Sequence, residues 1–449
     1  MRTLARLALD LQSFHTTSRA LVEDCLARIT APAGEGSLTF LRVYADTALA
    51  AADFHDRMRR LGAPVSPYAG IPMSIKDLFD VAGEVTTAGS VVLRDSPPAE
   101  RDAIAVARLK AAGFIPIGRT NMTELAFSGL GINPHYRTPL NIWDRETARI
   151  PGGSSSGAAV SITDGMAYAA LGTDTGGSCR IPAALCGIVG FKPTAHRVPL
   201  TGTVPLSTSL DSIGPLANSV SCCAILDALL SGSTGSPALQ PANLHGLRLA
   251  VPECLVFDDI EPHVAQTFSA ALSKLSHAGV QITEIPLREL LELPNINRKG
   301  GLSAAEAYAY HRQRLETKSA QYDPRVLSRI VRGREQDAAD YIELLHARSS
   351  WQRRVSALLQ PYDALVMPTT PIVAPKLSDF TSDETYTRLN TLVLRNPSII
   401  NFLDGCAISI PCHRDGEAPV GLTLAGLGDT DRNVLSIAAA VEALPLRES

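Results

Sequence analysis

The chain has 449 residues, of which 45% are hydrophobic and 19% are charged, and its formal net charge at pH 7 is −4. This composition excludes a disordered chain and allows a core large enough to enclose a catalytic site. The near-neutral charge argues against direct binding of nucleic acid and against a polybasic patch that binds membranes.

Helices are expected at the N-terminal end of the chain. Residues 3–30 carry two helical stretches, and Thr16-Thr17-Ser18 offers N-caps to the second one. Residues 43–61 form another amphipathic, alanine-rich stretch that stops before Gly62. We interpret residues 1–62 as a helical region that packs on the rest of the protein.

The first expected strand covers residues 70–77, which read GIPMSIKD and join an apolar run to a charged end. A helix is expected over residues 102–112, a strand over 114–118 and the start of another helix at Asn121. Residues 130–153 contain several prolines and a pair of glycines, so we expect loops there.

Strands and helices alternate through the remainder of the chain. A helix over 157–164 and a strand over 167–173 come first. Further strands are expected at 247–251, 280–285, 364–367, 407–410 and 421–425, and helices at 219–231, 262–278, 303–319, 337–360 and 430–443. This alternation predicts an α/β fold with a largely buried sheet. Residues 290–345 are rich in charge and helix signals, and we interpret them as a helical insertion over one edge of the sheet.

The sequence carries no feature of secretion or membrane insertion. The N-terminal residues lack the run of about seven apolar residues that a signal peptide needs. No stretch reaches the roughly 18 apolar residues of a membrane-spanning helix. The eight cysteines contain no CxxC pair. We therefore expect a cytoplasmic protein with reduced thiols and no membrane partner.

Two segments of small residues carry the chemistry. The cluster at residues 152–157 (GGSSSG) would indicate only a flexible turn if it stood alone. It is followed by residues 174–182 (DTGGSCRIP), in which two glycines precede Ser178. Glycines let the backbone turn sharply and leave amide N–H groups unobstructed, and such a nest beside a helix start stabilises an oxyanion. Ser178 is therefore a candidate nucleophile that faces its own hydrogen-bond donors.

A serine nucleophile needs a base. Of the ten histidines, only His196 lies near the cluster in sequence, and its surroundings indicate an exposed turn. A buried lysine is an alternative, because desolvation lowers its pKa. Lys76 fits best among the seven lysines, since apolar residues precede it. Lys192 is a rival, although Pro193 follows it at the expected start of a turn.

Residues 68–196 resemble the amidase signature family. The matching segments are residues 70–77, 151–157 and 171–193, and weaker similarity is found at residues 362–369 and 418–422. Although the length alone suggests about three domains, the resemblance covers most of the chain. It implies one domain over residues 1–449, built on a large mixed sheet with helices on both faces.

The resemblance also implies an amide hydrolase with a Ser–cis-Ser–Lys triad. It makes Ser178 the nucleophile, Ser154 the bridging serine on a cis peptide, and Lys76 the base that acts through Ser154. Its oxyanion hole corresponds to the backbone amides of Thr175, Gly176, Gly177 and Ser178. Its supporting positions correspond to Ser155, Asp174 and Arg180.

The resemblance also indicates residues of the substrate pocket, and the sequence differs from the usual family pattern at two positions. Residues 124–129 match a stretch beside the pocket, so Phe127 and Ser128 are candidates for substrate contact, with a core position as the alternative for Phe127. Ser156 replaces a more usual glycine. Cys179 stands where an aliphatic residue is common, and we interpret it as a packing residue.

Other serine-enzyme motifs explain the chain less well. Residues 153–157 satisfy GxSxG, the nucleophile elbow of α/β-hydrolases, but the polar residues 145–151 do not form the strand that must precede it. Neither a P-loop motif nor SxxK occurs. A non-catalytic protein that kept the fold is a further alternative, which activity on simple amides would separate.

We expect an amidase that hydrolyses a small carboxamide through an acyl-enzyme on Ser178. The alternatives are the glutaminase (A) subunit of the tRNA-dependent amidotransferase, and a hydrolase of urea or biuret-type compounds. No metal or organic cofactor is expected, because the serine–lysine relay supplies both proton transfers. The resemblance suggests a homodimer, and substrate selection is assigned to residues 290–345.

Overall fold

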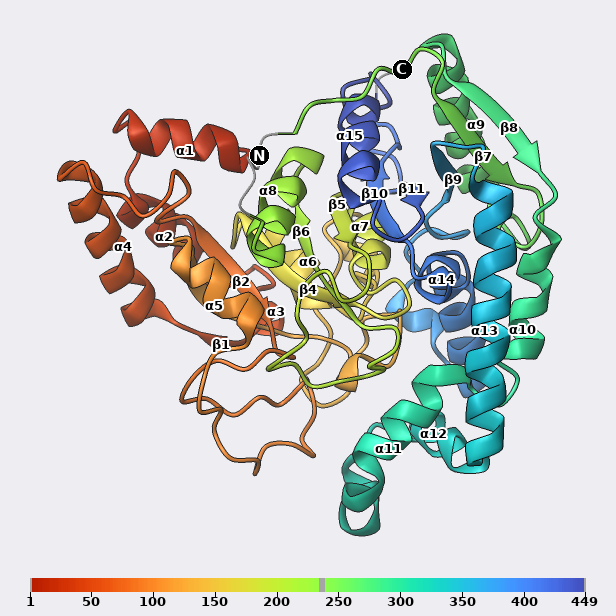
Figure 1. Cartoon of the computed structure of the whole chain (residues 1–449). Helices are drawn as coiled ribbons and strands as arrows, with labels where there is room; N and C mark the ends of the chain where they lie inside the picture. The colour runs from red at the N-terminus through yellow and green to blue at the C-terminus, as the bar shows by residue number, and fades with distance from the viewer. Residues whose placement is uncertain (1, 234–238, 448–449) are drawn as a thin grey trace.

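The computed structural model describes residues 2–233 and 239–447. In this part of the chain, strands assemble into a single sheet (Figure 1). The strands are β1 (Phe40–Val43), β2 (Pro72–Lys76), β3 (Ile115–Thr120), β4 (Ala169–Asp174), β5 (Val189–Lys192), β6 (Ser212–Ala217), β7 (Arg248–Pro252), β8 (Gln281–Ile285), β9 (Ala364–Pro368), β10 (Cys406–Pro411) and β11 (Gly421–Gly426).

The sheet is mixed, as the resemblance implied. Its strand order is β1-β3-β2-β4-β6-β5-β10-β11-β9-β7-β8. The pairs β2–β3, β2–β4, β7–β8 and β7–β9 are parallel, and the other neighbouring pairs are antiparallel. Two parallel groups therefore flank a central antiparallel region. Lys76 ends β2, and Ser178 follows β4 in the same parallel group.

Helices accompany the sheet along its whole length. They are α1 (Leu4–Gln12), α2 (Ser18–Ile29), α3 (Gly36–Thr39), α4 (Ala45–Arg60), α5 (Ile104–Ala111), α6 (Ser156–Thr163), α7 (Arg180–Cys186), α8 (Val220–Ser231), α9 (Pro262–His277), α10 (Leu293–Ile296), α11 (Gly301–Lys318), α12 (Pro324–Val331), α13 (Ala338–Leu359), α14 (Asp383–Leu403) and α15 (Asp431–Glu442). Helices α2 and α4 pack against β2 and β3, α1 lies above them and contacts α8, and α13 stands beside β7 and β9 (Figure 1).

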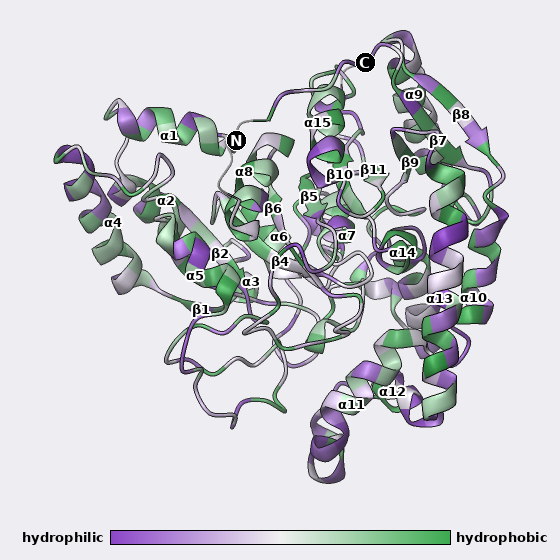
Figure 2. Ribbon diagram, viewed as in Figure 1, coloured by the Kyte–Doolittle hydropathy of each residue, from purple (hydrophilic) through white to green (hydrophobic). Residues whose placement is uncertain are grey.

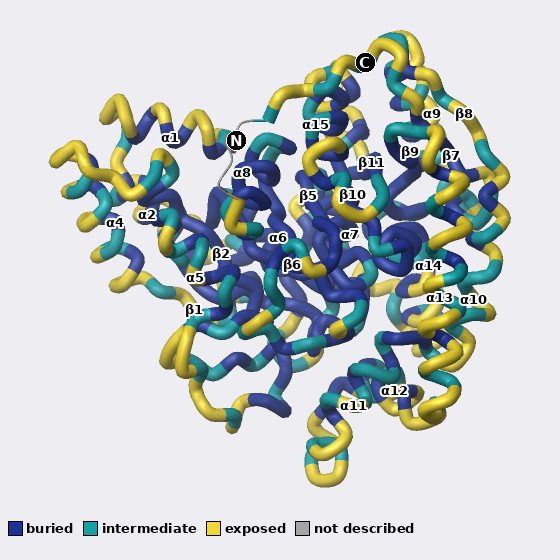
Figure 3. The backbone as a smooth tube through the Cα atoms, in the orientation of Figure 1, coloured by how far each residue is buried: buried dark blue, intermediate teal, exposed yellow. Residues whose placement is uncertain are grey.

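Strand β9 shows how helices cover both faces. Leu365 and Met367 belong to an apolar cluster with residues of α13 and α14. Val366 belongs to the main cluster, together with Phe268 of α9 and Val434 of α15. Because successive side chains of a strand point to opposite faces, the sheet is buried on both sides here. The tube in Figure 3 accordingly shows the strands as mainly buried and the outer helices as partly exposed, and Figure 2 shows hydrophilic residues on α11 and α13.

Most expected elements are confirmed, but several were missed and one was wrong. The sequence did not predict β1, β5, β6, α3 or α14, and it indicated α10 and α12 only as part of the helical stretch at 290–345. The helix expected to start at Asn121 is absent. Residues 124–126 form a single 3₁₀ turn, in which Leu125 has a φ of 52°. The Asn121 side chain instead donates to the carbonyls of Leu38 and Arg137, which holds the segment as a loop.

Helices α11 and α12 form the outlying group near the lower end of α13, and α10 lies beside α13 (Figure 1). They come from residues 293–331, inside the charged stretch at 290–345. Glu306 of α11 joins this group to the loop before β6 and to α13, since its carboxylate accepts hydrogen bonds from the hydroxyls of Ser207 (2.6 Å) and of Tyr341 in α13 (2.7 Å). Within the described residues, no helix is both long and apolar enough to cross a membrane.

Candidate active site

Lys76 is brought to the site by the parallel pairing of β2 and β4. Lys76 ends β2, and Thr173 lies near the end of β4, where Ile75 pairs with Leu171. The carboxyl ends of parallel strands meet at one edge of a sheet, which is the usual place for functional residues. Lys76 Nζ donates to Thr173 Oγ1 at 2.7 Å and to Ser154 Oγ at 2.8 Å.

The surroundings of Lys76 favour a neutral amine. Its side chain is 0% exposed and no carboxylate forms an ion pair with it among the described residues. Burial lowers the pKa of Lys76 to about 8, and the charges of Asp174 and Asp211 oppose this only partly. A lysine with this pKa is deprotonated, and so able to accept a proton, in a much larger fraction near neutral pH than an ordinary lysine.

Ser154 lies in a loop that is packed on all sides. The peptide bond between Gly153 and Ser154 is cis, the geometry that the resemblance implied. The Ser154 carbonyl accepts from the Thr123 amide at 3.1 Å, and the Gly153 amide donates to the Gly129 carbonyl at 2.8 Å. Ser154 is 0% exposed. These contacts hold its hydroxyl against Lys76 Nζ.

Ser178 sits in the turn between β4 and α7. The Ser155 amide donates to the Ser178 carbonyl at 3.3 Å, which joins the two serine segments. Within the described part of the chain, the Ser178 hydroxyl makes no hydrogen bond, including none to Ser154. Ser178 lines a cavity, whereas Lys76 and Ser154 lie behind it. Hydrogen bonds of a catalytic site are often completed only when substrate is bound.

Asp174 holds this turn together. Its carboxylate accepts from the amides of Gly177 (2.8 Å) and Cys179 (3.1 Å), and from the Arg180 guanidinium at 2.9 and 3.1 Å. Asn401 of α14 donates to the same carboxylate at 2.9 Å. Burial alone would raise the pKa of Asp174, but the Arg180 charge and these donors hold it below its ordinary value. The Asp174–Arg180 pair is fully buried.

The amides expected to form an oxyanion hole are not equally available. The Gly177 amide is already used by Asp174. The amides of Thr175, Gly176 and Ser178 donate to no group within the described residues. Gly177 has a φ of +123°, and an added Cβ would lie 2.5 Å from Pro397 Cβ, so this position requires glycine. Three amides therefore stay as candidate donors to an oxyanion, namely those of Thr175, Gly176 and Ser178.

Thr175 is fixed by a carboxylate that the sequence analysis missed. Its hydroxyl donates to Asp211 at 2.5 Å, and Asp211 also accepts from the amides of Leu206 (3.0 Å) and Ser207 (3.1 Å). Burial raises the pKa of Asp211 to about 6, although these donors oppose the rise. Asp211 therefore fixes the loop on one side of Ser178, and Asp174 fixes it on the other.

The alternative candidates for the base (Lys192 and His196) and for the nucleophile (Cys179) lie in environments that are less suited to these roles. Burial lowers the pKa of Lys192 to about 8, but Lys192 Nζ donates to the carbonyls of Pro193 and Gly405, each at 2.7 Å. His196 is exposed, as expected. Cys179 is 0% exposed, and burial raises the pKa of its thiol. A high thiol pKa is the opposite of what a nucleophilic cysteine needs, which favours the packing role.

A cavity of about 540 Å³ opens in front of Ser178. Ser128 lines it, and its hydroxyl donates to Asn390 Oδ1 at 2.8 Å while accepting from Tyr386 at 2.9 Å. Phe127 lines it as well and is half-buried, so it is both a wall of the cavity and a neighbour of the core. Helix α14 and residues 293–303 supply much of the remaining wall.

Comparison with known proteins identifies the family of the chain. The sequence profile of the family described as Amidase matches residues 20–435 of the chain. The chain belongs to the amidase family. It is 38% identical to the 2-amino-5-chloromuconic acid deaminase of Comamonas testosteroni, over 98% of this chain and 96% of that protein.

Two further comparisons extend the match to an amidotransferase component and to a solved structure. The amidase is 33% identical to the A subunit of the glutamyl-tRNA(Gln) amidotransferase of Chloroflexus aggregans, over 95% of this chain and 93% of that one. A crystal structure of an amidase superposes with a TM-score of 0.89 at 30% identity, covering 98% of this chain and 99% of the other. The protein is accordingly an enzyme of α/β fold that hydrolyses amide carbon–nitrogen bonds.

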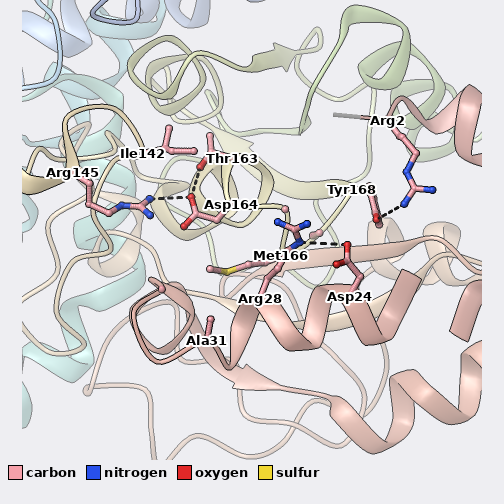
Figure 4. A pocket seen from close by; sticks show the side chains of 13 residues that line it. Arg2, Asp24, Arg28, Ala31, Ile142, Arg145, Thr163, Asp164, Met166 and Tyr168 are labelled. Carbon is pink, nitrogen blue, oxygen red and sulfur yellow. Dashed lines mark hydrogen bonds and ion pairs between the residues drawn. The ribbon is translucent and has the colours of Figure 1, made fainter. Parts of the chain in front are cut away.

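A second cavity, of about 520 Å³, lies between the N-terminal helices and the segment around α6 (Figure 4). Two of its arginines already have acidic partners. Arg145 pairs with Asp164 at 3.0 Å, and Arg28 pairs with Asp24 at 3.4 Å. It shares no lining residue with the cavity at Ser178. Within residues 2–233 and 239–447, no group of His, Cys, Asp and Glu side chains could hold a metal ion.

The buried Asp174–Arg180 pair yields a prediction about stability. Replacing Asp174 with asparagine leaves Arg180 buried without a counter-charge, so we expect the free energy of unfolding to fall by about 3–5 kcal/mol. Urea denaturation measures the change. Asp383→Asn is the matched control, because it removes a pair with Arg325 whose carboxylate is 82% exposed, and should cost at most about 1 kcal/mol. Equal effects of the two variants would contradict this role.

Proposed function

We propose that the amidase hydrolyses a small carboxamide through a covalent acyl-enzyme on Ser178, with Ser154 and Lys76 as its proton relay. The observation that carries the proposal is the hydrogen bond from Lys76 Nζ to Ser154 Oγ, directly behind the one serine of the relay that faces the cavity. Thr173 accepts a second hydrogen bond from Lys76, which directs the amine. Burial without an ion pair favours the neutral form that a base requires.

The reaction proceeds in two halves. Ser178 Oγ attacks the amide carbon while its proton passes to Ser154 Oγ, and the Ser154 proton passes to neutral Lys76. The same relay run backwards protonates the leaving nitrogen, so ammonia or an amine departs and an ester to Ser178 remains. Water then attacks the ester carbon and gives up a proton to the relay. The relay returns this proton to Ser178 Oγ as the ester bond breaks, and the acid product leaves as its carboxylate. No proton is gained or lost by the enzyme over the cycle.

The free backbone amides near Ser178 stabilise the transition state. One of these amides is that of Ser178 itself, and Gly176 and Thr175 lie two and three residues before it in the same turn. Unused donors in a water-poor site stabilise the negative oxygen that develops during attack. Asp174 and Asp211 do not touch the substrate in this proposal. They hold the loop through the contacts described above, and Arg180 and Asn401 hold Asp174.

The small carboxamide is preferred over the alternatives considered from the sequence. The A subunit of the tRNA-dependent amidotransferase is similar over most of the chain, but no contact in the structure favours it over a free amidase. Hydrolysis of urea or biuret-type compounds belongs to the same chemistry. The eight cysteines are all free, which supports work in a reducing compartment such as the cytoplasm. The homodimer stays a prediction.

A panel of amides tests the proposal. Ammonia release should be followed with glutamine, malonamide, arylacetamides, indoleacetamide and biuret, using the isolated chain. We expect at least one carboxamide to be hydrolysed without a partner protein. Turnover of glutamine only in the presence of a partner protein would instead favour the amidotransferase function.

The relay also predicts a pH dependence. Only neutral Lys76 accepts a proton, and burial lowers its pKa to about 8. Below that pH the lysine is protonated, so kcat/KM should fall about tenfold per pH unit as the pH decreases and should level off above it. A pH–rate profile with a neutral amide measures this. A rate that stays constant between about pH 5 and pH 9 would contradict the assignment of Lys76 as the base.

A further inference from the structure

The charged side chains that line the cavity at Ser178 are all positive. Three arginines line it, namely Arg329, Arg332 and Arg395. No aspartate or glutamate is found among the described residues that line it. The same wall contains apolar side chains, including Leu206, Leu210, Leu293, Leu302, Leu394 and Phe402. A cavity with cationic groups and no acidic ones favours an anionic ligand.

Arg395 is occupied by the protein itself. Its Nε donates to Asn396 Oδ1 at 3.1 Å, and its two terminal nitrogens donate to the carbonyls of Asp258 (2.6 Å) and Val256 (3.1 Å). Burial lowers the pKa of Arg395, and the nearby charges of Asp258 and Asp259 oppose this. Each of its nitrogens therefore has a partner, and Arg395 is less suited to hold a ligand.

Arg329 and Arg332 keep donors free. Arg329 donates one hydrogen bond, to the Phe127 carbonyl at 2.9 Å, and lies over the Tyr386 ring at 5.2 Å. Arg332 donates one, to the Arg298 carbonyl at 3.0 Å. Within the described part of the chain, neither forms an ion pair with a carboxylate. This differs from the second cavity, where two of the arginines have acidic partners.

The two arginines share one side of a continuous helical segment. Arg329 belongs to α12, and Arg332 begins the 3₁₀ turn (Arg332–Glu335) that continues it. Residues three apart in a helix are neighbours on its surface. Their guanidinium groups can therefore act on the same anion, and guanidinium donors match a carboxylate in geometry and charge.

We propose that Arg329 and Arg332 bind a carboxylate of the substrate, so that the preferred substrate is an amide of a dicarboxylic acid with one free acid group. This inference rests on the proposed function and adds its substrate class. The amide carbon meets Ser178, an apolar stretch of the substrate crosses the leucine-lined wall, and the free carboxylate reaches the arginine pair. Hydrolysis converts the amide and one water to a second carboxylate and ammonium, while the bound carboxylate is unchanged.

The test compares pairs of amides that differ only in the acid group. Monoamides of malonic, succinic, glutaric and adipic acid are each paired with the neutral primary amide of equal chain length. We expect wild-type kcat/KM to be at least about tenfold higher for the best acid than for its neutral partner. The preference should weaken as salt is added, because salt screens charge–charge attraction.

Variants assign the preference to the arginine pair. Arg329→Met combined with Arg332→Met should lower the acid-to-neutral ratio of kcat/KM by about 10- to 100-fold, mainly through KM for the acid. Lysine at both positions should restore part of the ratio, because it keeps the charge. Arg334→Met is the matched control: Arg334 lies in the same turn, is exposed and does not line the cavity, so the ratio should stay at the wild-type value.

The outcomes separate the inference from the proposed function. Equal or better hydrolysis of the neutral amides by the wild type would overturn the inference alone. An unchanged ratio in the double variant, with normal thermal unfolding, would overturn it as well. If the wild type hydrolyses no amide of either kind, the proposed function is overturned and the inference falls with it.

Discussion

Replacement of Ser178 by alanine is expected to reduce kcat for amide hydrolysis by at least about 10³-fold. Ser178 is the only relay residue that lines the cavity, so no other hydroxyl of the relay can reach the amide carbon. Ammonia release at saturating substrate measures the loss. Substrate binding should survive, because the alanine variant keeps the backbone amides and the cavity wall.

Ser156 provides the control for Ser178. Ser156 is buried in the first turn of α6 and its hydroxyl has no hydrogen-bond partner in the described structure. Ser156→Ala should therefore leave kcat within about twofold. Substantial turnover by Ser178→Ala, with Ser156→Ala unaffected, would show that another group attacks the substrate.

Replacement of Lys76 by alanine is the second large expected effect. It removes the final proton acceptor, so we expect kcat/KM to fall by about 10²- to 10⁴-fold. The rise of the rate toward pH 8 should vanish together with the amine that causes it. Initial rates from about pH 6 to pH 10 measure both changes.

Lys110 is a suitable control for Lys76. It lies on α5 and pairs with Asp102 at 2.8 Å on a partly exposed surface, where such pairs contribute little to stability. Lys110→Ala should keep the wild-type rate and pH profile. Near-normal hydrolysis by a folded Lys76→Ala protein would remove the basis for the serine–lysine relay.

The elements around Lys76 could be predicted because their local signals agree. The apolar run before Lys76 and the alternation of helices and strands are properties of adjacent residues. The glycines around Ser154 and Ser178 mark turns for the same reason. The segments of Lys76, Ser154 and Ser178 could therefore be identified from the sequence and from the resemblance.

Other elements have weak or contradictory local signals. Strand β6 contains Gly214 and Pro215, which are rare inside strands. Strand β5 is only four residues long and ends at Lys192 directly before a proline, which indicates the start of a turn. Helix α14 contains Pro397, yet Ser382 caps it and Asp383 stands in its first turn, a start signal that could have revealed it.

Other residues around Ser178 could not be predicted, for a different reason. Asp211, Arg329 and Asn401 are far from Ser178 in sequence and reach it only through the sheet order and the packing of α12 and α14. No periodic pattern marks such residues, because each is one polar side chain in an ordinary element. Their place near Ser178 can be recognised only from the tertiary structure.

The most direct test of the covalent mechanism is the mass of the enzyme during turnover. The reaction with a slowly hydrolysed amide should be stopped with acid within one turnover, digested, and analysed by fragment-ion mass spectrometry. We predict an added acyl group on Ser178, absent from the Ser178→Ala protein. An acyl group on Cys179 or Ser154 instead, or steady turnover with no acylated residue, would contradict the account.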